Sequence, residues 1–135
     1  MSVFKSSEEL HHVIGGFFSH LGKDELIGPK LLNSNLKLKF NYKDPNTNIF
    51  IDLSGDKLCL HFDDLELKPD VEMTMKADTA HKFWKGKVNL VTALARREIT
   101  AKGPIPKILK LLPIIKPAYA LYPPYLNDIS FNEAS

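Results

Sequence analysis

Residues 70–103 of this chain, DVEMTMKADTAHKFWKGKVNLVTALARREITAKG, contain the pattern that decides the fold. In residues 71–76 apolar and polar side chains alternate, which is typical of a strand with one buried face. Residues 98–103 carry a second, shorter alternation. Two segments between them, 79–85 and 90–97, are expected to be helical. The stretch therefore predicts a strand, two short helices and a strand in succession.

Both short helices carry end signals in the sequence. We expect Asp78 to cap the first helix and Asn89 the second, because such side chains accept hydrogen bonds from the free N–H groups of a first turn. Gly86 stands where a left-handed residue would end the first helix.

A longer helix is predicted near the N-terminus. Ser6 and Glu9 have the spacing of a capping box, and Gly22 is expected to end the helix. Gly15 and Gly16 each cost about 1 kcal/mol relative to alanine in a helix interior. They therefore either permit close packing or make the helix soft. The apolar residues recur at helical spacing and form one stripe: Leu10, Val13, Ile14, Phe17, Phe18 and Leu21.

Three more alternating segments, 36–42, 49–53 and 58–62, predict strands upstream of residue 70. They are joined by turn-forming sequences, KDPNTN at 43–48 and SGDK at 54–57. Strands with one apolar face each favour a sheet with one solvated side. The predicted fold is α+β, with a five-stranded, mainly antiparallel sheet and helices over one face.

The C-terminal segment is unusually apolar. Residues 104–122 hold twelve apolar residues, four prolines, three lysines and no acid. The prolines and lysines make it unsuitable as a bilayer-spanning helix. We expect a helix beginning near Pro104, kinked or ended at Pro113 and finished by Pro117, with stiff, irregular chain after it. One helical face is predicted to carry Ile108, Leu109, Leu112 and Ile115.

Size and composition indicate one globular domain spanning residues 1–135. The net charge of +2 is too small to favour nucleic acid as a partner. Cys59 is the only cysteine, which is compatible with a reducing compartment. The N-terminal sequence has no secretory signal pattern and the last residues are no peroxisomal tripeptide, so we expect a cytoplasmic protein.

The pattern of residues 70–103 resembles the sterol carrier protein-2 (SCP-2) lipid-transfer family. The order of elements before residue 70 and the apolar run after it agree, so the resemblance covers roughly residues 6–122. Two positions depart from the family pattern, because Arg97 stands where a glycine is frequent and Leu90 where proline is frequent. The matching residues are Asp70, Thr74, Met75, Gly86, Lys87, Asn89, Ala93 and Gly103.

The resemblance implies a hydrophobic tunnel enclosed by the sheet and the helices. It further implies a non-catalytic intracellular lipid carrier that binds a fatty acid, fatty acyl-CoA, phospholipid or sterol without a cofactor. An alternative is an accessory subunit that presents an isoprenoid or steroid substrate to a partner enzyme. The side chains expected to line the tunnel are Phe17, Phe40, Ile51, Leu60, Met73, Met75, Phe83, Trp84, Leu94, Ile108, Leu112, Ile115 and Tyr119.

From their spacing alone, these side chains are better interpreted as a solid core, as in a protein-interaction module, and only the resemblance favours a cavity. Lys107, Lys110 and Lys116 can meet anionic headgroups during transient contact with a membrane surface, or they can be merely solvated. Arg96 and Arg97 can bind an anionic head, although pairing with nearby acids is favoured.

Catalytic and metal sites are not indicated. The five histidines are interpreted as ordinary surface residues, and we expect no metal site and no catalytic residue. His11 and His12 are adjacent, so on a helix they point about 100° apart. A third alternative is an enzyme that uses Cys59 with His61, since these alternate on one strand face, but an unreactive thiol is the favoured interpretation.

Overall fold

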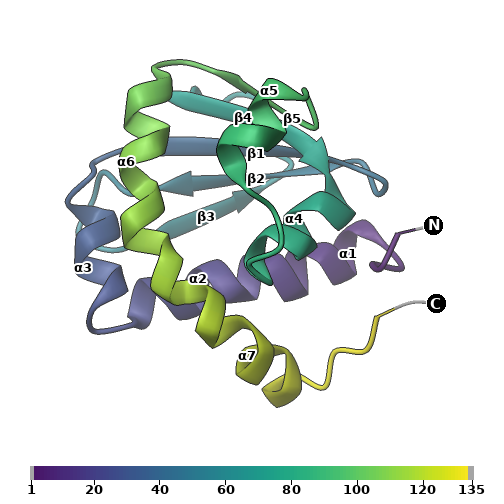
Figure 1. Cartoon of the computed structure of the whole chain (residues 1–135). Helices are drawn as coiled ribbons and strands as arrows, with labels where there is room; N and C mark the ends of the chain where they lie inside the picture. The colour runs from purple at the N-terminus through teal and green to yellow at the C-terminus, as the bar shows by residue number, and fades with distance from the viewer. Residues whose placement is uncertain (1, 134–135) are drawn as a thin grey trace.

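The computed structural model describes residues 2–133 and contains one five-stranded sheet with helices packed on one side of it (Figure 1). The strand order is β3-β2-β1-β4-β5. Only β1 and β4 pair in parallel, and the other neighbours are antiparallel. The predicted fold class is confirmed. The strands are β1 Lys37–Lys43, β2 Thr47–Asp52, β3 Cys59–Phe62, β4 Val71–Lys76 and β5 Ile99–Lys102.

The alternation in the sequence sets which side chains enter the core. Phe40 on β1 lies opposite Ile49 of β2 and Met73 of β4. In the next row, Tyr42 lies beside Met75. Because strand side chains alternate between faces, these rows point together toward the helices, and the lysines of β1 point to the opposite face.

The helices form the second layer, and several of them cross the sheet in Figure 1. Near the N-terminus α1, η1 and α2 follow one another without a break, and α6, η2 and α7 follow the last strand. The helical elements are α1 Ser7–Leu10, the π-helical turn η1 His11–Gly15, α2 Gly16–Lys23, α3 Ile27–Leu32, α4 Ala77–Trp84, α5 Leu90–Ala95, α6 Ile105–Ile115, the 3-10 helix η2 Lys116–Leu121 and α7 Tyr122–Asp128.

The start of the N-terminal helix is as predicted, but its end is not. The hydroxyl of Ser6 accepts a hydrogen bond from the backbone N–H of Glu9 at 3.1 Å. Gly22 does not end the helix, which continues to Lys23. Asp24 then turns extended, and its carboxylate accepts from the N–H of Leu26 at 2.9 Å and of Ile27 at 2.8 Å, just before α3. These hydrogen bonds lower the pKa of Asp24. The sequence interpretation missed α3, which is short and contains glycine and proline.

The paired glycines of the N-terminal helix permit close packing. A Cβ atom on Gly15 would lie 2.8 Å from the ring of Phe62, and one on Gly16 would collide with the hydroxyl of Tyr125. That hydroxyl donates to the carbonyl of Val13 at 2.8 Å. The glycines therefore allow α7 and β3 to approach the helix closely.

The two predicted caps of the short helices have different outcomes. Asn89 caps α5, accepting from the N–H of Thr92 at 3.0 Å, as expected. Asp78 does not cap α4, because it lies inside the first turn. Instead it accepts from the Ser2 hydroxyl and the Val3 N–H, both at 2.9 Å, and so fixes the N-terminal segment to α4. Gly86 has φ +77° and ends α4 as predicted.

The C-terminal segment is more regular than predicted. Helix α6 passes through Pro113 and ends at Ile115, and helical structure continues to Asp128. The expectation of irregular chain was wrong because the later prolines, Pro117 and Pro123 among them, occupy the first turns of η2 and α7. In a first turn the missing N–H has no intrahelical partner to lose.

Arg97 adopts a left-handed conformation where the family pattern has glycine. Its φ is +60°, and the N–H of Glu98 donates to the carbonyl of Ala93 at 2.9 Å, which closes the end of α5. A side chain costs about 1 kcal/mol in this region of backbone space.

We expect Arg97→Gly to raise the free energy of unfolding by about 1 kcal/mol, because glycine tolerates this backbone conformation. Urea denaturation measures the change. Arg97→Ala is the matched control and should stay near wild type, since alanine keeps the Cβ atom. Equal effects of the two substitutions would contradict the explanation.

Candidate ligand-binding cavity

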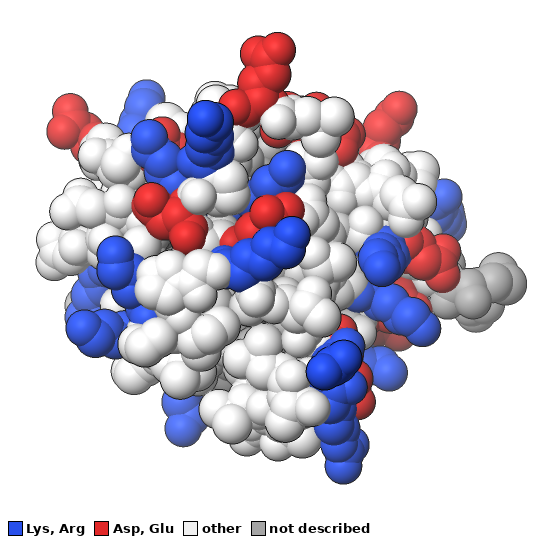
Figure 2. Space-filling view, turned by 90° about the horizontal axis from the view of Figure 1, so that it is seen from above, with Lys and Arg blue, Asp and Glu red and all other residues white. Residues whose placement is uncertain are grey.

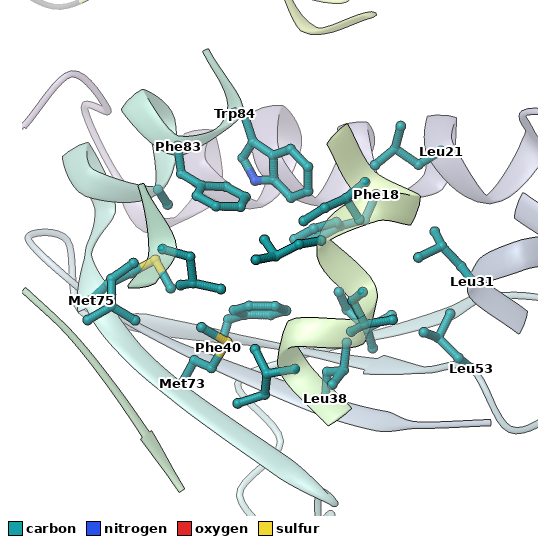
Figure 3. A pocket seen from close by; sticks show the side chains of 18 of the residues that line it. Phe18, Leu21, Leu31, Leu38, Phe40, Leu53, Met73, Met75, Phe83 and Trp84 are labelled. Carbon is teal, nitrogen blue, oxygen red and sulfur yellow. The ribbon is translucent and has the colours of Figure 1, made fainter. Parts of the chain in front are cut away.

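An apolar cavity of about 90 Å³ lies between the sheet and the helices (Figure 3). In Figure 3, Phe40 and Met73 border it from the sheet, and Phe83 and Trp84 face them from α4. Among residues 2–133 no charged side chain lines it. The sheet side consists of Leu38, Phe40, Tyr42, Ile51, Met73, Met75 and Ile99, with Leu53 and Leu58 from the β2–β3 connection.

The helical side is contributed by five separate helices. Helix α6 supplies Ile108, Leu111, Leu112 and Ile115, which share one face because they are three or four residues apart. The remaining wall comes from α2 to α5 and consists of Phe18, Leu21, Leu31, Ala80, Phe83, Trp84 and Leu90. A wall assembled from so many elements is closed only when the whole domain is folded.

Most of the side chains predicted to line a cavity lie around this one: Phe40, Ile51, Met73, Met75, Phe83, Trp84, Ile108, Leu112 and Ile115. The sequence interpretation missed others, among them Phe18, Leu58 and Leu111. Leu109, predicted on the same helical face as Ile108 and Leu112, does not line the cavity and is 36% exposed.

Four predicted residues, Phe17, Leu60, Leu94 and Tyr119, do not line the cavity. Phe17 is fully buried, but it faces Tyr122 with ring centroids 4.8 Å apart, on the side of α2 that α7 covers. Tyr119 packs against Phe83 at 5.5 Å. Leu60 and Leu94 are half-buried against the rest of the core.

The cavity is smaller than a lipid chain. An apolar cavity on the order of 150 Å³ holds one benzene ring. A volume of about 90 Å³ therefore leaves no room for a long hydrocarbon unless the wall moves. Met73 and Met75 are flexible side chains suited to such repacking. Within residues 2–133 the structure shows an apolar cavity at the expected place but does not show a continuous tunnel.

Two polar groups interrupt the apolar wall. Tyr42 is 3% exposed and Trp84 is 6% exposed. Among residues 2–133 the side-chain hydrogen bonds include none made by the Tyr42 hydroxyl or the Trp84 indole N–H. Neither atom is a fully buried group without a partner, since the atom of that kind in these residues is Asn48 Oδ1. In Figure 3 the indole nitrogen lies on the ring edge that faces the pocket. Burial raises the pKa of Tyr42, so its hydroxyl stays neutral and can donate to a ligand oxygen.

We expect Tyr42→Phe to leave the free energy of unfolding unchanged or slightly higher, because no protein hydrogen bond is lost. Tyr122→Phe is the matched control. It removes a hydrogen bond to the buried imidazole of His81 and should cost about 1–3 kcal/mol. Urea denaturation of both variants makes the comparison, and a large loss in Tyr42→Phe would reveal an unrecognised partner.

His81 is buried, so the interpretation of all five histidines as surface residues was wrong for this one. It is 2% exposed, and its ring nitrogens lie 2.7 Å from the Tyr122 hydroxyl and 2.7 Å from a Glu133 carboxylate oxygen. Lys85 pairs with the same carboxylate. Because Tyr122 and Glu133 are 41 and 52 residues away from His81 in sequence, no local sequence pattern predicts that His81 is buried.

This network changes two pKa values. Burial lowers the pKa of His81 from its ordinary 6.5, although the hydrogen bond with Glu133 opposes the change. Hydrogen bonds from Lys85 and His81 lower the pKa of Glu133 to about 2. Above pH 6.5 the folded and unfolded chains both hold neutral His81, and below it the unfolded chain takes up the proton more readily.

Stability should therefore fall as the pH drops below 6.5, by at most about 1.4 kcal/mol per pH unit for this one proton. Urea midpoints between pH 7.5 and 5.5 measure the loss. In His81→Gln this component of the pH dependence should disappear. An unchanged slope in that variant would show that other groups cause it.

Cys59 and His61 lie outside the cavity. Both are exposed on β3, and His61 packs edge-on against Phe50 with ring centroids 6.0 Å apart. Within residues 2–133 no three metal-ligating side chains come together. None of the helices in this part of the chain is both long and apolar enough to cross a bilayer.

The sequence pattern of the SCP-2 sterol transfer family matches residues 18–116. The chain belongs to this family. Membership implies lipid binding or transfer, which agrees with the apolar lining of the cavity. A search of curated proteins finds no match.

Solved SCP-2 structures share this fold. Sterol carrier protein domain 2 of Helicoverpa armigera superposes with a TM-score of 0.67 at 18% identity, over 87% of this chain and 91% of that one. Palmitated SCP2L2 from Aedes aegypti gives 0.56 at 21% identity, over 85% and 95%. The ubiquinone synthesis protein UbiJ-SCP2 gives 0.62 at 13% identity, over 78% and 91%.

A region of the sec-alkylsulfatase Pisa1 from Pseudomonas sp. is also similar, with a TM-score of 0.57 at 20% identity over 64% of this chain. This chain spans only 14% of the length of that enzyme. At these identities the structural likenesses establish the fold.

Proposed function

We propose that this protein is a non-catalytic lipid carrier that takes one hydrocarbon chain into the cavity under α6. The observation that carries the proposal is the apolar cavity, lined from both layers in a member of a lipid-transfer family. A structural relative binds palmitate, according to its description as palmitated. A fatty acyl chain is therefore the first ligand to test.

Burial of the chain supplies the binding energy. Each CH₂ group removed from water contributes about 0.8 kcal/mol, so a sixteen-carbon chain has on the order of 10 kcal/mol available. Ordering the chain and moving the cavity wall reduce this amount. The balance is compatible with micromolar or tighter binding and with release to another acceptor.

Entry of the chain requires displacement of part of the wall, and α6 is the suitable part. Its outer side exposes Ile105 by 37% and Leu109 by 36%, close to Lys107 and Lys110. Apolar side chains flanked by lysines suit brief contact with an anionic membrane surface. Such contact would loosen α6 where the lipid is transferred.

A second candidate function is presentation of a lipid-like substrate to a partner enzyme. The similarity to a ubiquinone synthesis protein favours it, because ubiquinone carries an isoprenoid chain. The same cavity serves both functions. Stable complex formation with an enzyme in pull-down experiments would favour presentation over free transfer between membranes.

Filling the cavity tests the carrier proposal. Ala80 is 2% exposed and lines the cavity, so Ala80→Leu should occupy its space and weaken binding of a fluorescent fatty acid at least tenfold. Ala120→Leu is the matched control, because Ala120 is exposed on η2, and it should bind like wild type. A thermal transition confirms folding of both variants. Equal binding by all three proteins would place the fatty acid elsewhere.

A further inference from the structure

A second hollow lies on the surface between α3 and α6. Its volume is about 320 Å³, and it is open to solvent. Three lysines surround it, Lys30 from α3 and Lys107 and Lys110 from α6, and no acidic side chain of the described residues lines it. Its other lining residues are Asn33, Ser34, Leu36, Leu111 and Ile114. We call this hollow the lysine groove.

The charge of the lysine groove is uncompensated. Within residues 2–133 none of its three lysines lies within salt-bridge distance of a carboxylate. On the face shown in Figure 2, by contrast, basic and acidic side chains are interspersed. Three ammonium groups around one hollow repel each other, and a bound anion removes that repulsion. The Asn33 amide can donate a further hydrogen bond.

Leu111 connects the lysine groove with the apolar cavity. Its side chain lines both hollows and is 8% exposed. It is therefore the partition between a positively charged surface site and the interior space proposed for the hydrocarbon chain. Leu36 and Ile114 extend the apolar floor of the groove toward this partition.

We propose that the lysine groove holds the anionic headgroup of the lipid whose chain occupies the cavity, with Leu111 as the gate between them. The proposal rests on the function proposed above and adds an orientation, with the head at α3 and α6 and the tail inside. Three lysines match a phosphate-bearing head better than a single carboxylate, since a phosphate offers more charge and more acceptor oxygens.

Lys116 serves as a control that separates an effect of the lysine groove from an effect of the protein's overall positive charge. It is exposed on η2 and does not line the groove, although its sequence position suggested a role like that of Lys107 and Lys110. Lys57 and Lys68 are likewise exposed and outside the groove. These three residues give a control variant with the same change in net charge.

The test compares two probes with the same chain, hexadecyl phosphate and 1-hexadecanol, each displacing a neutral fluorescent apolar probe. Wild type should bind the phosphate at least tenfold more tightly at low salt. The variant Lys30→Gln/Lys107→Gln/Lys110→Gln should lose this preference and keep its affinity for hexadecanol. The control Lys57→Gln/Lys68→Gln/Lys116→Gln should keep the preference. Retention of the preference in the groove variant would overturn the proposal.

The experiment also separates the proposed headgroup from two other anions that the groove lysines could bind, an anionic membrane surface and free phosphate. If the groove lysines serve a membrane, the groove variant loses binding to vesicles containing anionic lipid but keeps the phosphate preference, which contradicts the proposal. If inorganic phosphate competes as strongly as hexadecyl phosphate, the groove is an anion site unconnected to the cavity, which also contradicts it. If neither probe displaces the reporter from wild type, the carrier function itself fails.

The gate is tested by association kinetics. Leu111→Ala should raise the stopped-flow association rate of hexadecyl phosphate several-fold, because the partition becomes smaller. Leu109→Ala is the matched control on the same helix, since Leu109 lines neither hollow. Thermal transitions verify that both variants are folded. Equal rates in the two variants would remove Leu111 as the gate.

Discussion

The parallel pairing of β1 with β4 is the constraint on which the rest of this structure depends. It places Phe40 beside Met73 and Tyr42 beside Met75, and so forms the centre of the sheet's apolar face. Because β4 leads directly into α4, the same pairing sets Phe83 and Trp84 over that face. The large side chains of the sheet and of the helices do not fill all the space between the two layers, and the cavity lies in the remaining space.

The C-terminal segment completes the enclosure. Its inner face supplies one side of the cavity wall, whereas its outer face stays partly apolar and carries lysines. Helix α6 is one of the five helices that line the hydrophobic interior, and its proposed displacement would let a carrier load and release its ligand. The apolar lining suits the proposed binding of a hydrocarbon chain.

The sequence predicted what depends on local pattern. Strand alternation predicted the inward side chains of β1 and β4, and helical spacing predicted most of the α6 face. The orientation and burial of side chains that depend on contacts with distant parts of the chain were not predicted. Phe17 turns to α7 instead of the cavity because α2 is covered on two sides, and His81 is buried by partners far along the chain. Asp78 likewise binds the N-terminal segment instead of capping its own helix.

The central claim is that a hydrocarbon chain occupies the space between the sheet and α6. The most direct measurement is NMR of the protein with carbon-13-labelled palmitate, recording intermolecular contacts to the methyl groups of Met73 and Met75. We predict contacts from the chain methylenes to both methyl groups. Contacts confined to exposed residues such as Leu26 or Leu65, with both methionines unaffected, would contradict the account.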